Sequence, residues 1–237
     1  MTASWAAAPS FGGGDGSPLG SIALFALVVG VALLFSMLSR TRERSRRQEF
    51  LTRATENGWY EPGPADALPA SVAAAKDSDR SQLLLTTRRD GENIWISWHR
   101  WTERKDSSAY NSSAGRSETD TRTTTHDLTR CFVRAGGHPE PISLERRTKV
   151  GGLFIPVRGE GTGDASFDRA FLVHPKEGAP IHLLTQDIRD EMLAGLIPLW
   201  QIDETGMLVT RYDEAPGADT LEQHADALLH VLDLLPR

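Results

Sequence analysis

Residues 19–38, LGSIALFALVVGVALLFSML, form an apolar run without a charged side chain, in which Ser21 and Ser36 are the only polar side chains. A bilayer core of roughly 30 Å needs about 20 helical residues, and lipid requires every backbone polar group to be paired within the segment. The run therefore predicts a single transmembrane helix. A signal peptide fits less well, because no Lys or Arg precedes the run. An interfacial helix would need a polar face that the run lacks.

Charged residues beside the run predict its orientation. Only Asp15 precedes it, whereas five arginines follow it closely: Arg40, Arg42, Arg44, Arg46 and Arg47. Because Lys and Arg near a span stay on the cytoplasmic side, residues 1–18 are predicted to be a flexible extracytoplasmic tail. The expected localisation is the inner cell membrane, with the lipid bilayer as a partner. The same five arginines are candidate contacts for anionic lipid.

The chain after the run predicts one helix and one domain. Residues 39–58 are rich in helix formers and are expected to form a basic juxtamembrane helix that ends at Gly58. Residues 59–237 suffice for one cytoplasmic domain of ordinary size. Residues 150–237 carry 6 basic and 15 acidic side chains, which argues against nucleic acid as the main partner. The small residues Ala26 and Gly30 leave a homodimer through the transmembrane helix open.

Hydrophobic periodicity and turn signals predict the fold class of this domain. Residues 83–103 are expected to form a β-hairpin around Asp90-Gly91, and residues 200–212 a second one around Thr205-Gly206. Other stretches with strand character are 59–61, 123–134, 142–147, 153–157, 167–173 and 181–184. The predicted fold class is α+β: an N-terminal single transmembrane helix, then one mostly antiparallel β-sheet domain closed by a C-terminal helix.

Two helices are predicted in the C-terminal half. Thr185 is expected to cap the first, with a buried stripe of Ile188, Met192 and Leu196. The second covers residues 219–235 and begins with a predicted capping box, Thr220 with Gln223. Its apolar residues recur with the helical period and should pack on the sheet: Leu221, Ala225, Leu228, Leu232 and Leu235.

The segment at about 105–122, KDSSAYNSSAGRSETDTR, is rich in Ser, Thr, Asn and Gly and has almost no apolar residue. This composition predicts a long mobile loop between two strands. The strand before it carries tryptophans on both faces, so it is expected to be covered on both sides. Trp95 and Trp101 are nevertheless candidate contacts for a partner or for lipid headgroups, together with His99, Arg100 and Arg104. Core packing is the competing interpretation of the two tryptophans.

No catalytic, cofactor-binding or metal-binding motif is evident. Asp226, His230 and Asp233 share one face of the last helix, but a solvated polar face explains them equally well. His126 and Cys131 are five residues apart on one strand, roughly 16 Å at about 3.3 Å per residue, so they are not expected to touch. The glycine-rich residues 159–164 fail the dinucleotide and P-loop patterns, and the sequence after them alternates like a strand.

One resemblance supports the overall architecture. The pattern Phe167-x-x-x-Phe171-x-Val173, followed by Leu183-Leu184-Thr185 and the helix to Leu196, resembles the closing part of a family of uncharacterised actinobacterial membrane-anchored proteins. The resemblance covers about residues 150–212. It implies one or two N-terminal spans and a domain of unknown function, and it implies no catalytic residues.

These observations predict a domain that binds or scaffolds protein partners at the cytoplasmic membrane face. Two alternatives remain open. One is a membrane-tethered enzyme whose site is built from dispersed residues, and it would require a pocket with convergent polar groups around His99, His126 or His182. The other is an anionic-lipid surface sensor that uses the five arginines and the tryptophan hairpin.

Overall fold

The computed structural model describes residues 47–111, 116–137, 140–147, 149–150, 153–154, 161–175 and 178–236, together with Met37 and Ser45. The chain divides into two compact units, Met1–Glu49 and Phe50–Arg237. The second unit carries the fold described below. The predicted tail at 1–18 and the arginines Arg40, Arg42, Arg44 and Arg46 lie outside the described residues.

The predicted fold class is wrong in its first element. Among the described residues, no helix combines the length and the apolar character that a membrane crossing needs. The longest helix of that part, α5 (Ala218–Leu234), has 17 residues and several carboxylates, whereas a crossing takes about 20 mostly apolar residues. The described fold is α+β without a transmembrane helix. Residues 19–38 lie outside the described part, apart from Met37.

A seven-stranded antiparallel sheet forms the centre of the second unit, as the alternation of the strands predicted. Its spatial order is β1-β2-β3-β9-β8-β4-β7, and every pairing is antiparallel. The strands are β1 (Ser81–Arg89), β2 (Glu92–Asn111), β3 (Arg116–Arg134), β4 (Ile142–Arg146), β7 (Phe171–His174), β8 (Trp200–Ile202) and β9 (Met207–Tyr212). Two short strands, β5 (Lys149–Val150) and β6 (Leu153–Phe154), pair separately.

Two predicted hairpin turns are confirmed. Asp90 and Gly91 both have positive φ, 50° and 88°, and they join β1 to β2 with Arg89 opposite Glu92. This geometry matches the two-residue turn that suits the right-handed twist of a sheet. Residues 203–206 join β8 to β9, where the Asp203 carboxylate accepts the backbone N–H groups of Thr205 and Met207.

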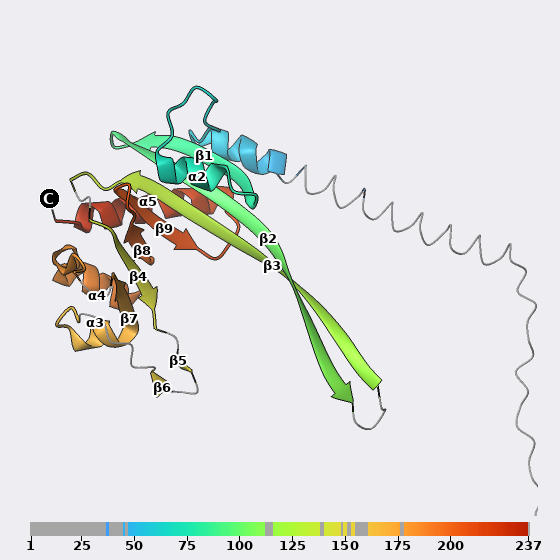
Figure 1. The fold of residues 1–237 in the computed structure, drawn as a ribbon. Helices are drawn as coiled ribbons and strands as arrows, with labels where there is room; N and C mark the ends of the chain where they lie inside the picture. The colour runs from blue at the N-terminus through green and yellow to red at the C-terminus, as the bar shows by residue number, and fades with distance from the viewer. Residues whose placement is uncertain are drawn as a thin grey trace, which may run out of the picture. The chain divides into compact units, whose positions relative to one another are not determined.

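Helices cover the two faces of the sheet unequally (Figure 1). The larger core lies under α5, α4 (Gln186–Ala194) and α3 (Ala165–Ala170), and it takes Ile94 and Ile96 from β2. The smaller core lies under α2 (Ala70–Lys76) and takes Trp95. The prediction that β2 is covered on both faces is therefore confirmed. Helix α2 itself was not predicted.

The entry to the domain agrees with the sequence. Residues 47–56 are helical, and Gly58 follows with a φ of 82°. The Trp59 N–H donates to the Ala54 carbonyl at 2.9 Å, which closes the helix end. Tyr60 then forms an isolated antiparallel bridge with Thr86 of β1. The predicted helix end at Gly58 is confirmed.

Two strand predictions in the C-terminal half are wrong. Residues 165–170 form helix α3, and of the predicted strand 167–173 only residues 171–173 are extended, as part of β7. Phe167 and Phe171 are four residues apart, a spacing that suits one face of a helix as well as one face of a strand. Residues 181–183 form a 3-10 turn, η1, in place of the predicted strand.

The two predicted helices are present with small corrections. Thr185 caps α4 by accepting the Ile188 N–H, as expected, but Leu196 is 71% exposed and is not part of the buried stripe. In α5 the first three residues of the predicted stripe, Leu221, Ala225 and Leu228, are buried, whereas Leu232 is partly buried and Leu235 is the C-cap residue. The N-terminal cap lies three residues earlier than predicted. Gly217 is the N-cap, and its N–H donates to Thr220 Oγ1 at 2.7 Å.

The predicted mobile loop at 105–122 is a strand pair. Strands β2 and β3 continue through this segment, from Lys105 opposite Arg122 to Asn111 opposite Arg116. Residues 112–115 between them lie outside the described part. Tyr110, Thr119 and Thr121 favour extended backbone, and the pairing of backbone groups itself needs no apolar side chain.

Candidate functional site

The most distinctive feature of the fold is the two-stranded extension of β2 and β3, here called the ribbon (residues 100–111 and 116–127). Strand β1 pairs with β2 only as far as His99, and β9 pairs with β3 only as far as Thr129. Beyond these points, 12 residue pairs join β2 and β3 without a third strand in the described part of the chain, and at the first pair the Arg100 N–H also donates to the Arg80 carbonyl at 3.0 Å. At about 3.3 Å per residue the ribbon extends roughly 40 Å. Figure 1 shows it twisting away from the other strands.

A charged cluster secures the root of the ribbon on the α5 face of the sheet. The Asp127 carboxylate accepts the Trp98 Nε1–H at 2.9 Å and the Arg100 Nε–H at 2.8 Å. The Arg100 guanidinium also lies 4.7 Å from the Trp98 ring centroid. Burial alone would raise the pKa of Asp127, but these hydrogen bonds and the Arg100 charge outweigh it and lower the pKa.

An aromatic stack secures the same root on the opposite face. The rings of Trp101 and His126 lie face to face with centroids 5.2 Å apart. The Arg80 guanidinium covers Trp101 at 5.2 Å from the ring centroid. Glu103 Oε2 lies 3.4 Å from His126 Nε2. The ribbon therefore begins between two clusters that fix its direction from both faces.

We expect Asp127→Asn to loosen this root. The substitution removes the charge that pairs with Arg100 and weakens the bond from Trp98, with a loss of about 1–2 kcal/mol in the free energy of unfolding. Because the pKa of Asp127 is lowered in the fold, its contribution is complete above the unfolded pKa of about 4 and is lost as the pH falls through the lower folded value. Chemical denaturation at pH 7 and pH 3 measures this. If the free energies of unfolding of variant and parent differed as much at pH 3 as at pH 7, the stabilising role of the Asp127 charge would be contradicted.

The residues predicted to contact lipid or a partner do not lie together on one exposed surface of the described part of the chain. Trp95 is 7% exposed inside the smaller core, so it cannot serve as a surface contact, and core packing is the correct interpretation. Trp101 is partly exposed at the ribbon root. Arg47 is exposed, and the other four arginines lie outside the described residues. The lipid-surface interpretation thus loses one of its two tryptophans.

The weighed histidine and cysteine candidates do not converge. His126 lies opposite Trp101 and Cys131 opposite Ile96, so the two residues project from opposite faces of β3. Cys131 is fully buried, and burial raises the pKa of its thiol to about 12. Such a thiol is an unreactive packing residue at neutral pH.

Two of the three candidate residues on α5 contact other elements, and the third, Asp233, is exposed. Asp226 pairs with Arg89 of β1 at 3.0 Å, and His230 Nε2 lies 2.7 Å from Glu191 Oε2 of α4. Among the described residues, no group of three or more His, Cys, Asp or Glu side chains is placed to hold a metal ion.

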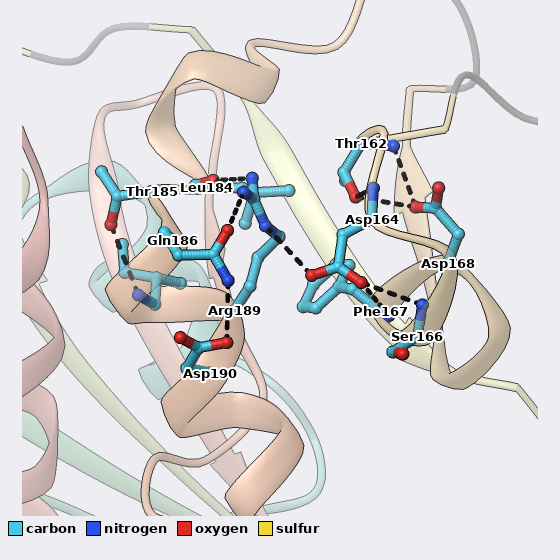
Figure 2. A network of polar contacts seen from close by, with 11 residues as sticks. Thr162, Asp164, Ser166, Phe167, Asp168, Leu184, Thr185, Gln186, Arg189 and Asp190 are labelled. Atoms are coloured by element: carbon cyan, nitrogen blue, oxygen red, sulfur yellow. Dashed lines mark hydrogen bonds and ion pairs between the residues drawn. The ribbon is translucent and has the colours of Figure 1, made fainter.

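Figure 2 shows a polar network that joins the start of α3 to the start of α4. Asp164 Oδ1 accepts the N–H groups of Ser166 and Phe167, so the helix end after the glycine-rich segment is closed by its own chain. Arg189 donates to the Leu184 carbonyl at 2.6 Å and to Gln186 Oε1 at 2.7 Å, with Asp164 Oδ2 3.7 Å from its Nε. A helix follows the glycines, contrary to the sequence prediction, but its donors are already used. The network holds two short helices together.

Three cavities in the described part of the chain do not coincide with the histidines on which an enzyme site would depend. One of them, about 540 Å³, lies at the end of α5 and is lined by acidic and apolar side chains with Arg134. Neither it nor the other two of these cavities is lined by His99, His126 or His182. The dispersed-site enzyme therefore gains no support from these residues.

Comparison with known proteins supplies no relative. No family model, no curated protein and no solved structure matches the chain. The resemblance to actinobacterial membrane-anchored proteins thus stays a prediction.

Proposed function

We propose that the domain binds protein partners and that the ribbon is its contact element. The observation that carries this proposal is the length of the ribbon: 12 residue pairs without a third strand in the described part of the chain. An isolated two-stranded hairpin is marginally stable in water at best. The ribbon is stabilised at its root by Asp127 and by the Trp101–His126 stack. These contacts support its projection from the sheet.

The two edges of the ribbon determine the kind of partner. Each edge offers backbone N–H and C=O groups that natural sheets usually cover or pair. An extended segment of another protein can add a strand to such an edge, with main-chain hydrogen bonds supplying affinity. Nucleic acid fits less well, because the ribbon sequence contains five basic and five acidic residues and offers no excess charge for phosphates. The proposed partner is thus a protein that contributes a strand.

Site-specific photo-cross-linking tests this proposal. A benzoylphenylalanine is placed at the exposed Arg122 of the ribbon in the full chain, and at the exposed Asp187 of α4 as the matched control. Irradiation of cells should give a discrete adduct from position 122 and none from position 187. An adduct at the mass of two chains would assign a second copy as the partner. Equal labelling at both positions, or labelling at 187 alone, would refute the ribbon as the contact element.

A further inference from the structure

Beside α2, the sheet carries a row of polar residues across three strands. Ser97 of β2 lies opposite Arg130 of β3, and Arg130 lies opposite Arg211 of β9. Residues directly opposite in antiparallel strands project to the same face with Cβ atoms about 5 Å apart. His99 follows Ser97 on that face of β2, two residues along. The register thus brings two arginines and a histidine together.

This row is partly buried and lacks a carboxylate partner among the described side chains. His99 is 4% exposed and shares a hydrogen bond with Ser97 Oγ at 3.0 Å. Arg130 is half-buried, and its buried Nε has no hydrogen-bond partner in that part of the structure. Arg211 donates from Nη2 to Gln201 Oε1 at 2.8 Å, a neutral acceptor. Both guanidinium groups therefore keep unused donors.

Burial and the neighbouring positive charges disfavour the charged forms of Arg130 and His99 in this row. Burial and, after it, the charge of Arg211 lower the pKa of Arg130. Burial and, after it, the charge of Arg130 lower the pKa of His99. Two like charges side by side in a partly desolvated place are unfavourable unless an anion joins them. Acidic side chains do line the adjoining groove of about 270 Å³, namely Glu145 and Asp213, and both are exposed.

We propose that Arg130 and Arg211 form a binding site for an oxyanion, either the phosphate or the carboxylate group of a ligand. Arginine guanidinium groups bind both kinds of group through paired N–H donors. The buried Nε of Arg130 would gain the acceptor that it lacks, and the anion would offset the repulsion between the two arginines. The site lies on the sheet face and not on the ribbon, so it stands independently of the proposed protein partner.

Anion titration of the full chain tests the site. Inorganic phosphate and acetate are added separately at constant ionic strength, with chloride as the balance, and binding is followed by the thermal midpoint and by the NMR signals of the arginine Nε–H groups. We expect a saturable response that Arg211→Gln weakens at least tenfold. Arg88→Gln removes the same charge from an exposed position of β1 and should leave the response unchanged. Tighter binding of phosphate than of acetate would assign a phosphorylated ligand, and the reverse a carboxylate.

Substitution of Arg130 gives a second measurement on the same site. Arg130→Gln should also weaken anion binding at least tenfold, and it should leave the thermal midpoint in chloride equal or higher, because one of two repelling charges is removed. The exposed Arg211 keeps the test decisive if Arg130→Gln does not fold. An unsaturable response, or equal weakening by Arg88→Gln and Arg211→Gln, would overturn the proposal.

Discussion

A chain in which residues 104–123 are replaced by Asp-Gly is expected to fold and to lose its protein partner. The pair Glu103 and Thr124 would then flank a two-residue turn, as Arg89 and Glu92 flank Asp90-Gly91 in the native β1–β2 hairpin. No residue of 104–123 belongs to either core of the described part, so the thermal midpoint should change by only a few degrees. With benzoylphenylalanine placed at Trp101 or at a flanking position, the yield of the partner adduct should be more than tenfold lower in this variant than in the chain with the full ribbon.

A shorter deletion serves as the graded control for this prediction. Replacing residues 108–119 by Asp-Gly leaves Ser107 opposite Asp120 and keeps the eight ribbon pairs that are nearer the sheet. If the partner adds a strand along the ribbon, binding should fall in proportion to the pairs removed, because each pair contributes main-chain hydrogen bonds. Circular dichroism and thermal melting show whether each variant folds. Undiminished partner binding by the longer deletion would exclude the ribbon as the contact element.

The ribbon is a part of the fold that could not be predicted from the sequence. A strand that is half-buried alternates between apolar and polar residues, and that alternation is what a sequence reader detects. The sequence of residues 105–122 has almost no apolar residue and so shows no such alternation, and its Ser, Thr and Gly content indicated a loop. Backbone pairing requires only an extended chain and a neighbour. The Asp90-Gly91 turn was found because its residues have a direct conformational cause, a positive φ.

Helix α3 around Phe167 and the Arg130–Arg211 row could not be predicted from the sequence, for two different reasons. Phe167 and Phe171 pack with ring centroids 4.9 Å apart, yet their spacing of four is shared by helix and strand, so the pattern could not decide. Arg130 and Arg211 become neighbours only through the pairing of β3 with β9, two strands far apart in the chain. No local signal encodes that pairing. The α5 stripe, by contrast, repeats with the helical period, and its residues Leu221, Ala225 and Leu228 were located correctly.

Trp59 is the residue at which the start of the domain is joined to its last helix. Its ring is 1% exposed in the larger core, and its Nε1–H donates to Glu222 Oε1 of α5 at 2.7 Å. Glu222 also pairs with Arg89 of β1, whose guanidinium lies 5.8 Å from the Trp59 ring centroid. The Trp59 side chain thus joins the entry segment to the edge strand β1 and to the closing helix α5.

Trp59→Ala is therefore expected to cost about 3–5 kcal/mol in the free energy of unfolding, since it removes a fully buried ring and leaves Glu222 without one of its donors. For a domain of this size that loss corresponds to a fall of about 10 °C in the thermal midpoint. Trp59→Phe retains most of the ring and should cost less than half as much. Tyr60→Ala is the matched control, because its side chain is 53% exposed and its bridge to Thr86 is made by the backbone. Equal losses for Trp59→Ala and Tyr60→Ala would show that the helix end, and not the buried ring, holds this junction together.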